Sequence, residues 1–349
     1  MPCFGSRDRS CCRDAASQGL SVHPLGAALP PAGPRRSALT VARSFSAAAN
    51  PPHCSPQGDH CSPLGSTSEG SFGYCAKWSN GVTEPQPGID TTTPQSPRVW
   101  NYWLGGKDNY EVDRQVGDEV IAMTPQLPKL ARESRRFLIR AVEYLAGEVG
   151  IRQFLDIGTG LPTADNTHQV AQRVAPESKI VYVDNDPVVL AHARALLVGT
   201  PQGVTRYLDE DLYAPERILR DAGKTLDLNQ PVALMLMGIL GHVADWDQAK
   251  AIVRELVSGL PSGSYLTTCD STNVHDTEAM DRAASIYNAA ASPRIHLRRP
   301  WHFTELVTEL GLEAVAPGAV PVTQWGVAED QLVPRPEPID EYGVVARKP

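Results

Sequence analysis

From residue 153 onward the sequence alternates short apolar runs with helical patterns, and this alternation limits the possible folds more than any other feature. The apolar runs cover residues 153–157, 180–183, 205–208, 232–237 and 264–268. The helical patterns between them cover 166–174, 187–197, 215–221 and 245–260. Strands that alternate with helices form right-handed crossovers. We therefore expect an α/β fold with a mostly parallel sheet and helices on both faces.

Further elements flank this alternation. Two amphipathic helices are expected before it, at 112–123 and 128–148, and two more helices after it, at 277–290 and 300–310. We expect Tyr287 and Trp301 to be core residues of the last two helices. Segments 313–322 and 342–347 have the pattern of strands, and the connection between them contains Pro334, Pro336 and Pro338 but no helical pattern. The last pair of strands should therefore be antiparallel.

Residues 1–90 have the composition of a disordered tail. They are rich in Pro, Gly and Ser, and they hold six of the seven cysteines without any hydrophobic period. A zinc site at Cys54, Cys61 and Cys75 is an alternative, but the segment has no Cys-x2-Cys pair. We expect residues 91–349 to form one domain, in which a helical N-terminal lid at 91–150 precedes a Rossmann-like core at 151–349.

Charge and hydropathy exclude several classes of protein. The net charge of the chain is −8, and the acidic excess lies after the tail. This balance disfavours a nucleic-acid partner, because binding phosphates needs clustered cations. The longest apolar stretch without a charged residue covers 231–244, which is shorter than the roughly 20 residues that span a bilayer. We expect a cytoplasmic protein with no membrane or metal partner, and we see no signal for a particular oligomeric state.

Three acidic residues follow three successive predicted strands. Asp156 lies two residues before Gly158 in the segment FLDIGTGLPTADNTH, and Gly160 follows. Asp184 ends the second strand, 24 residues after Gly160, near the spacing of about 20 at which an acid binds a ribose. Asp211 follows the third strand, where it would lie beside an adenine. Ligands bind at the carboxyl ends of parallel strands, so these residues predict a nucleoside site.

The residues around the glycines indicate which nucleoside compound is bound. A dinucleotide fingerprint needs a third glycine, but Thr163 occupies that position. A pyrophosphate would also lie close to Asp156, whereas a carboxylate there suits a cation such as the ammonium of a methionine group. The chain has no Tyr-x-x-x-Lys pair, and Asp108 and Asn101 break the pattern of a phosphate-binding Walker loop. S-adenosylmethionine, which is cationic and free of phosphate, fits best.

Three segments together resemble the S-adenosyl methyltransferase family that is common in actinobacteria and was long classed as a domain of unknown function. They are FLDIGTGLPTADNTH, VYVDNDPVVLAHARALL and VWNYWLGGKDNYEVDRQVGDEV, and the resemblance extends from about residue 97 to 327. It implies a class I methyltransferase fold, with a seven-stranded sheet whose last strand is antiparallel. It also implies that Asp156 and the glycines line the methionine end, that Asp184 binds the ribose and that Asp211 binds the adenine.

Candidate catalytic residues follow the fourth and fifth predicted strands. His242 and Asp270 could each act as a general base, although methyl transfer needs one only if the acceptor loses its proton early. The segment around Gly105 and Gly106 could fold over the ligand as a lid that brings Tyr110 to the sulfonium. The expected cofactor-binding residues are Lys107, Asn109, Asp156, Gly158, Thr159, Gly160, Asp184, Asn185, Asp211 and Leu212.

The sequence therefore predicts a methyltransferase that uses S-adenosylmethionine and acts on a small-molecule acceptor. One alternative is a regulatory protein that binds S-adenosylmethionine without transferring its methyl group. A second alternative is a nicotinamide-dependent oxidoreductase, against which the missing third glycine counts.

Overall fold

The structure is a computed structural model that describes residues 89–196, 199–327 and 336–349. The expected tail and the cysteines considered for zinc lie almost wholly outside these residues. The described part of the chain builds one eight-stranded sheet, with the strand order β3-β2-β1-β4-β5-β8-β6 and with β7 paired to β8. The strands are β1 (Gln153–Ile157), β2 (Lys179–Asp184), β3 (Val204–Asp209), β4 (Ala233–Met237), β5 (Tyr265–Ser271), β6 (Glu313–Ala314), β7 (Val320–Pro321) and β8 (Glu341–Arg347).

The sheet confirms the expected fold and differs from it at one strand. Strands β1 to β5 are parallel, and β8 runs antiparallel to β5. The single strand expected at 313–322 is divided into β6 and β7, which both pair with β8. Pro317 offers no N–H group for pairing, and Gly318 turns the chain with a φ of 88°. Eight strands therefore replace the seven that the resemblance implies.

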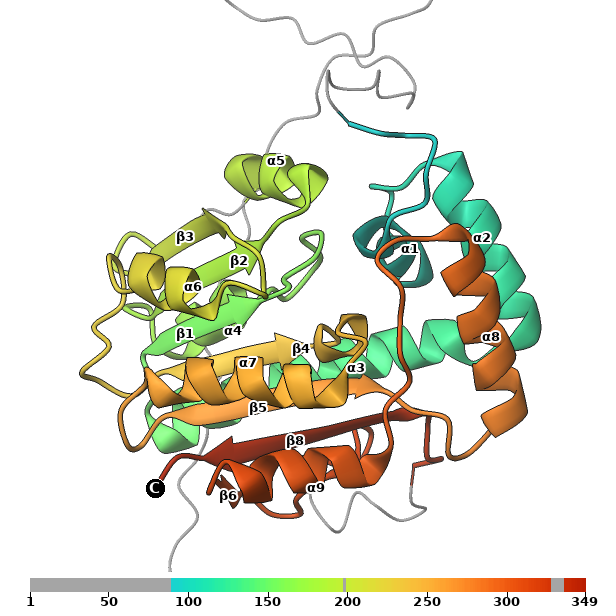
Figure 1. Cartoon of the computed structure of the whole chain (residues 1–349). Helices are drawn as coiled ribbons and strands as arrows, with labels where there is room; N and C mark the ends of the chain where they lie inside the picture. Colours follow the sequence, from blue (N-terminus) through green and yellow to red (C-terminus); the bar gives the residue numbers. More distant parts are fainter. Residues whose placement is uncertain (1–88, 197–198, 328–335) are drawn as a thin grey trace, which may run out of the picture. The chain divides into compact units, whose positions relative to one another are not determined.

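Both faces of the sheet are buried, as the continuous apolar runs predict. In β1, Phe154 packs into the hydrophobic cluster on one face, while Leu155 and Ile157 pack into the cluster on the other. The first face is covered by α3 (Leu127–Glu143) and α4 (Thr167–Val174), and the second by α6 (Pro215–Ala222), α7 (Trp246–Ser258) and α9 (Pro300–Glu309). Figure 1 shows α6, α7 and α9 in front of the sheet, and α5 (Pro187–Leu196) lies near β3.

Three further helices lie beyond the carboxyl ends of β4 and β5 (Figure 1). They are α1 (Ser96–Trp103), α2 (Glu111–Met123) and α8 (Thr277–Ala290). Helix α1 ends where Gly105 adopts a φ of 80°. Arg98 and Asp113 form a buried ion pair of 3.0 Å that joins α1 to α2, and α2 packs against α8. These helices form a wall opposite the strand ends.

The other predicted helices are confirmed. One of them continues into an unexpected π-helical turn, and the expected burial of one side chain is wrong. The helix expected at 128–148 is α3 followed by a π-helical turn, η1 (Tyr144–Val149). Tyr287 is buried on α8 as expected, but Trp301 on α9 is 58% exposed, so its assignment to the core is wrong. Across the described ranges, the helices are too short or too polar to cross a bilayer.

Candidate active site

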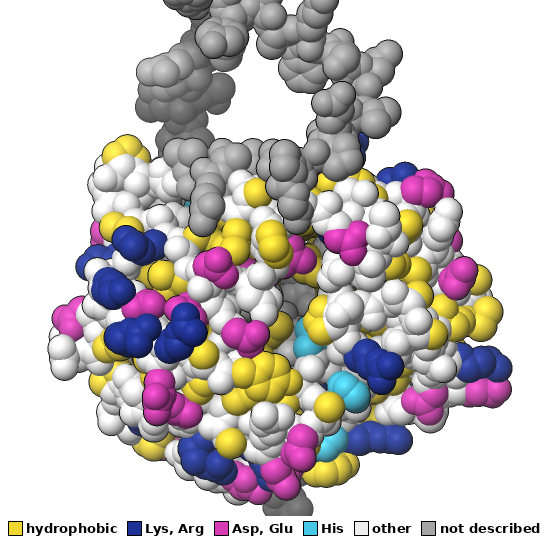
Figure 2. All heavy atoms as spheres, turned by 45° about the horizontal axis from the view of Figure 1, so that its top comes forward, with side chains coloured by type: hydrophobic (Ala, Val, Ile, Leu, Met, Phe, Trp, Pro, Cys, Tyr) yellow, Lys and Arg dark blue, Asp and Glu magenta, His cyan; other side chains and the backbone are white. Residues whose placement is uncertain are grey.

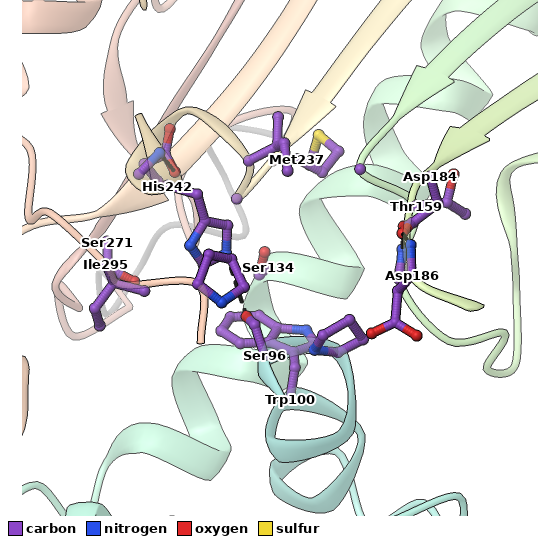
Figure 3. A pocket seen from close by; sticks show the side chains of 18 of the residues that line it. Ser96, Trp100, Ser134, Thr159, Asp184, Asp186, Met237, His242, Ser271 and Ile295 are labelled. Carbon is purple, nitrogen blue, oxygen red and sulfur yellow. Dashed lines mark hydrogen bonds between the residues drawn. The ribbon is translucent and has the colours of Figure 1, made fainter. Parts of the chain in front are cut away.

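A cavity of about 570 Å³ lies between the strand ends and the helical wall. Figure 2 shows acidic and hydrophobic side chains gathered around a hollow on this face of the molecule. One side of the cavity, here called the acidic edge, is formed by the last residues of β1 and β2 and by the residues that follow β1, β2 and β3. The other side, the helical chamber, is formed by α1, α3, α8 and segment 292–297, with the ends of β5 and β8. In Figure 3, Asp184 and Thr159 lie across the cavity from His242 and Ile295.

The turn after β1 needs its two glycines for different reasons. Gly158 has a φ of 73°, and a Cβ atom on it would lie 2.5 Å from the Ile239 side chain, so only glycine fits. Gly160 has a φ of 65°, and a Cβ there would meet no atom within 4 Å. Thr159 lies between them and donates its hydroxyl hydrogen to the Asp156 carbonyl at 3.2 Å. All three residues line the cavity and leave open space beside Gly160.

Asp156 is a buried carboxyl group near the centre of the cavity lining. Its Oδ2 accepts a hydrogen bond of 2.6 Å from the Thr167 hydroxyl, and burial raises its pKa to about 6. The Arg135 guanidinium on α3 opposes this shift and also lines the cavity. It donates hydrogen bonds to the carbonyl oxygens of Ala164 and Asp165. The sequence analysis missed Arg135, because nothing in the sequence distinguishes it from the neighbouring arginines of the helix.

Asp184 and Asp211 continue the acidic edge along β2 and β3. The two Asp184 oxygens accept backbone hydrogen bonds, at 2.9 Å each, from Gly160 and Asp186. Burial raises the pKa of Asp184 to about 6. Asp211 Oδ2 accepts a hydrogen bond of 2.9 Å from the Asn185 amide. The structure therefore brings eight of the predicted cofactor residues to one cavity. They are Asp156, Gly158, Thr159, Gly160, Asp184, Asn185, Asp211 and Leu212.

This edge fits S-adenosylmethionine. A carboxylate offers about four lone-pair sites, so Asp184 can accept ribose hydroxyls in addition to its two backbone N–H groups. Asp156 could pair with an ammonium group, and Arg135 could pair with a carboxylate. The cavity volume falls within the range of about 300–1,000 Å³ that is usual for small-molecule and cofactor sites. The open space beside Gly160 leaves room for a ligand close to the backbone.

His242 lies at the entrance to the helical chamber, in the 3₁₀ turn η2 (Leu240–His242). Its Nδ1 lies 2.9 Å from the Arg294 carbonyl oxygen and its Nε2 lies 3.2 Å from the Ser96 hydroxyl. A carbonyl oxygen only accepts hydrogen bonds, so Nδ1 carries the proton and Ser96 donates to Nε2. Burial lowers the pKa of His242, which favours the neutral ring. Ser96 was not predicted, because it is 146 residues away from His242 in the chain.

Asp270 lies in the floor of the helical chamber, within β5 rather than after it, because the strand continues to Ser271. It is 3% exposed, and burial raises its pKa to about 8. Its Oδ1 accepts a hydrogen bond of 2.8 Å from the Gly241 N–H. Glu341, at the start of β8, lines the same floor and is 1% exposed. The sequence analysis did not single out Glu341, whose burial depends on the pairing of β8 with β5.

Three residues of the expected lid do not reach the cavity in this structure, although other residues of the segment, such as Trp100 and Trp103, do. Among the described residues, the cavity lining includes Asn101 but not Lys107, Asn109 or Tyr110. Lys107 is exposed, the Asn109 amide bonds to Asn101 at 2.9 Å, and the Tyr110 N–H donates to Asp113 where α2 begins. This geometry gives no support to contact of these three residues with the cofactor, because two of them are engaged in turning the chain from α1 into α2.

Comparisons with known proteins identify the family. The profile of the S-adenosyl methyltransferase family matches residues 82–349. A DUF574 family protein from Streptomyces avermitilis MA-4680 is 45% identical, with a TM-score of 0.70 over 74% of this chain and 99% of that one. A proposed methyltransferase from Thermobifida fusca YX is 35% identical, with a TM-score of 0.67 over 76% and 99%. A search of curated proteins gave no match.

The family result and the cavity agree, and both count against the oxidoreductase alternative. The matched region contains the glycine turn, the three acidic residues of the edge and the whole helical chamber. The residues at the strand ends predicted that the cofactor is a cationic adenosine compound rather than a dinucleotide, and this prediction is thereby confirmed. The chain belongs to the S-adenosyl methyltransferase family, and it is a methyltransferase that uses S-adenosylmethionine to methylate an acceptor.

Proposed function

We propose that the acidic edge holds S-adenosylmethionine and that a small-molecule acceptor occupies the helical chamber. The observation that carries this proposal is the continuity of the two sides, which belong to one cavity, with Met237 between His242 and Thr159. An acceptor in the chamber would lie beside the methionine end of the cofactor. Holding two reactants about 3–3.5 Å apart and in line accounts for much of the rate of a displacement reaction.

The residues of the acidic edge have distinct proposed roles. Asp156 binds the ammonium of the methionine group, and Arg135 binds its carboxylate. Asp184 accepts hydrogen bonds from the ribose hydroxyls, while Asp211 and Asn185 bind the adenine edge. The supporting observations are the order of these residues along β1, β2 and β3 and their common cavity.

His242 is proposed as the general base. When bound, S-adenosylmethionine supplies a methyl group on a positively charged sulfur. The unprotonated Nε2 of His242 takes up the proton that the acceptor loses, after the acceptor has replaced the Ser96 hydroxyl as its hydrogen-bond donor. The Arg294 carbonyl holds the ring by Nδ1 throughout. The lowered pKa keeps the imidazole neutral at pH 7, which is the protonation state that a base needs.

The charge of the cavity supports a small-molecule acceptor over a nucleic acid. Of the described side chains that line it, seven are acidic and one, Arg135, is a guanidinium. Phosphate groups would be repelled by such a lining, whereas nucleic-acid sites gather Lys and Arg. The expected cytoplasmic location stays a prediction.

A labelling experiment tests this function. The protein is incubated with S-adenosylmethionine carrying a radioactive methyl group and with either a small-molecule extract, RNA or DNA. We expect label in the small-molecule fraction and binding of S-adenosylhomocysteine, but not NADPH, in a calorimetric titration. Label confined to RNA or DNA would contradict the proposed acceptor class. Binding of S-adenosylhomocysteine without label in any fraction would favour the regulatory alternative.

A further inference from the structure

We propose that Trp100 binds the methylsulfonium group of S-adenosylmethionine and in this way distinguishes the methyl donor from its product. This inference rests on the proposed function, because it needs the donor at the acidic edge and the acceptor in the helical chamber. The methyl group must then be transferred at the junction of the two sides. Trp100 belongs to α1 and lines the cavity, and its place along the helix puts it at this junction.

Helix α1 runs along the cavity from the acceptor side to the donor side. At its start, the Ser96 hydroxyl lies 3.2 Å from His242, at the entrance to the helical chamber. Just after its end, Leu104 lines the cavity and also a smaller pocket that it shares with Thr163, in the loop after the glycine turn. Trp100 is four residues from Ser96 and four from Leu104. Residues four apart lie on one face of a helix, about 6 Å apart along its axis, so Trp100 lies midway between the two sides.

The sheet side of the cavity agrees with this placement. In Figure 3, Trp100 and Met237 lie opposite each other. His242 lies to one side of them in this view and Asp186 to the other. Met237 ends β4, which lies between β1, the strand that leads into the glycine turn, and β5, the strand that carries the floor of the chamber. The junction therefore has Met237 on its sheet side and Trp100 on its helical side.

The Trp100 indole has a face that can receive a ligand. Within the described part of the chain, its aromatic contact is an edge contact with Trp103, at 5.8 Å and an interplanar angle of 67°. Such a contact covers at most one face of a ring. Trp100 is only partly buried, whereas Trp103 is 7% exposed and its indole N–H points to the Gly117 carbonyl oxygen at 3.3 Å. Trp100 is therefore better placed than Trp103 to contact the donor.

The charge of the donor suits an aromatic face. The methyl group gives the sulfur a positive charge, and the face of an indole attracts cations more strongly than that of any other side-chain ring. The carboxylates of Asp156 and Asp184 are already assigned to the ammonium and the ribose. An indole face holds the sulfonium without an oxygen that competes for the methyl group. Because transfer leaves the sulfur uncharged, Trp100 favours binding of the donor over binding of the product.

This assignment moves the expected aromatic contact to another residue of the same segment. Tyr110 was expected at the sulfonium, but it is absent from the described lining of the cavity. Its ring is instead covered by the Arg98 guanidinium, whose central carbon lies 5.1 Å from the ring centroid. The segment therefore supplies an aromatic face to the cavity through helix α1, rather than through the loop that follows it.

A comparison of S-adenosylmethionine with S-adenosylhomocysteine tests the inference, because the two ligands differ only in the methyl group and its charge. Each is titrated calorimetrically into the protein without an acceptor. Trp100→Leu keeps an apolar side chain but removes the aromatic face. We expect it to lower the ratio of the affinity for S-adenosylmethionine to that for S-adenosylhomocysteine by about threefold to thirtyfold, the range of cation–π contacts. Sinefungin, in which an amine-bearing carbon replaces the methylsulfonium, should lose affinity as S-adenosylmethionine does.

Further variants separate this contact from a structural role of the side chain. Trp100→Phe keeps a weaker aromatic face and should lower the affinity ratio less than Trp100→Leu. Trp100→Met is a second non-aromatic variant, used if Trp100→Leu does not fold. Trp301→Leu, which removes an exposed tryptophan of α9 outside the cavity lining, should leave the ratio unchanged. A side chain that only supports α1 would change both affinities by the same factor, and the affinity for S-adenosylhomocysteine shows whether each variant is folded.

The outcomes are distinguishable. If the wild-type protein binds neither S-adenosylmethionine nor S-adenosylhomocysteine, the proposed function fails. If it binds both, but the affinity ratio is the same in the wild type and in the non-aromatic variants of Trp100, the sulfonium contact is rejected while the proposed function survives. An equal fall of the ratio in Trp301→Leu would also reject the contact.

Discussion

The backbone N–H of Gly241 donates a hydrogen bond of 2.8 Å to Asp270 Oδ1, and this bond joins the turn that carries His242 to the floor of the helical chamber. A Cβ atom on Gly241 would lie 2.9 Å from the same oxygen, so the approach requires glycine. The proposed base and this buried carboxyl group are therefore held in a fixed relation. An acceptor bound at the floor would be presented to His242 by the same loop.

Replacing Asp184 should weaken cofactor binding. Asp184→Ala removes the acceptor for the ribose hydroxyls and leaves the Gly160 and Asp186 N–H groups without their partner, so we expect a loss of about 1–3 kcal/mol in S-adenosylhomocysteine affinity. Isothermal titration calorimetry measures the loss. The matched control is Asp209→Ala, which removes the exposed residue aligned with Asp184 on β3. Equal affinities of wild type and Asp184→Ala would contradict the assignment of the ribose.

Replacing His242 should slow transfer without affecting the cofactor. General bases typically contribute about 10²–10⁴-fold to a rate, and we expect His242→Gln to lower kcat within this range. The affinity for S-adenosylhomocysteine should stay unchanged, because His242 lies across the cavity from the acidic edge. Radioactive methyl transfer, measured once an acceptor is found, gives kcat. Ser96→Ala is the comparison variant, and its loss should be smaller since Ser96 is displaced by the acceptor.

The pKa of His242 predicts the pH profile of the reaction. A base acts in its deprotonated form, and burial lowers the pKa of His242 below the usual 6.5. We therefore expect kcat to rise with pH on the acidic side of 6.5 and to be level by pH 7. In His242→Gln this acidic limb should disappear. If kcat of the wild type instead rises at a pH well above 7, Asp270, whose pKa is about 8, is the base.

The buried carboxyl group of Asp270 should make the ligand-free protein less stable as the pH rises. Its pKa is raised from 3.8 to about 8 in the folded state, so the folded protein binds the extra proton between these values, and that contribution to stability is lost as pH increases. Asp270→Asn lacks this titration. We expect its free energy of unfolding, relative to wild type, to increase between pH 5 and pH 8, and each unit of pKa shift is worth about 1.4 kcal/mol. Urea denaturation at the two pH values measures the change, and a constant difference would contradict the shift.

Breaking the ion pair between α1 and α2 should destabilise the helical wall. Both Arg98 and Asp113 are buried, and Asp113 also accepts hydrogen bonds from the N–H groups of Gln95 and Tyr110. Asp113→Ala leaves a buried charge unpaired, which typically costs about 3–5 kcal/mol. Glu111→Gln, in an exposed pair with Arg114 on the same helix, should cost at most about 1 kcal/mol. Chemical denaturation of both variants provides the comparison, and similar losses would mean that the buried pair is not special.

The sequence predicted the fold well because its signals were local. Apolar runs marked β1 to β5 to within a few residues, and the helical patterns between them marked α4 to α7 in the same way. The acidic residues of the edge were predictable for the same reason, since topology brings the ends of neighbouring parallel strands together. Trp301 was misjudged because a short helix with hydrophobic residues on several sides does not reveal which side meets the sheet.

The helical chamber was largely beyond prediction because it is assembled from distant parts of the chain. Ser96 contacts His242 across 146 residues, and Ser271 contacts Glu341 across 70. Neither pair carries a local pattern. Lys107, Asn109 and Tyr110 were assigned to the ligand on the strength of an unusual segment, whereas part of that segment serves to connect two helices.

The division of the cavity has a consequence for how such enzymes diversify. The acidic edge is built from the carboxyl ends of β1, β2 and β3 and the turns after them, while the opposite wall comes from α1, α8 and segment 292–297. If the acidic edge binds the methyl donor as proposed, mutations in those outer elements leave the donor-binding residues of this edge unchanged. Related enzymes can in this way differ in the methyl acceptor that they bind and still share the same methyl-donor site.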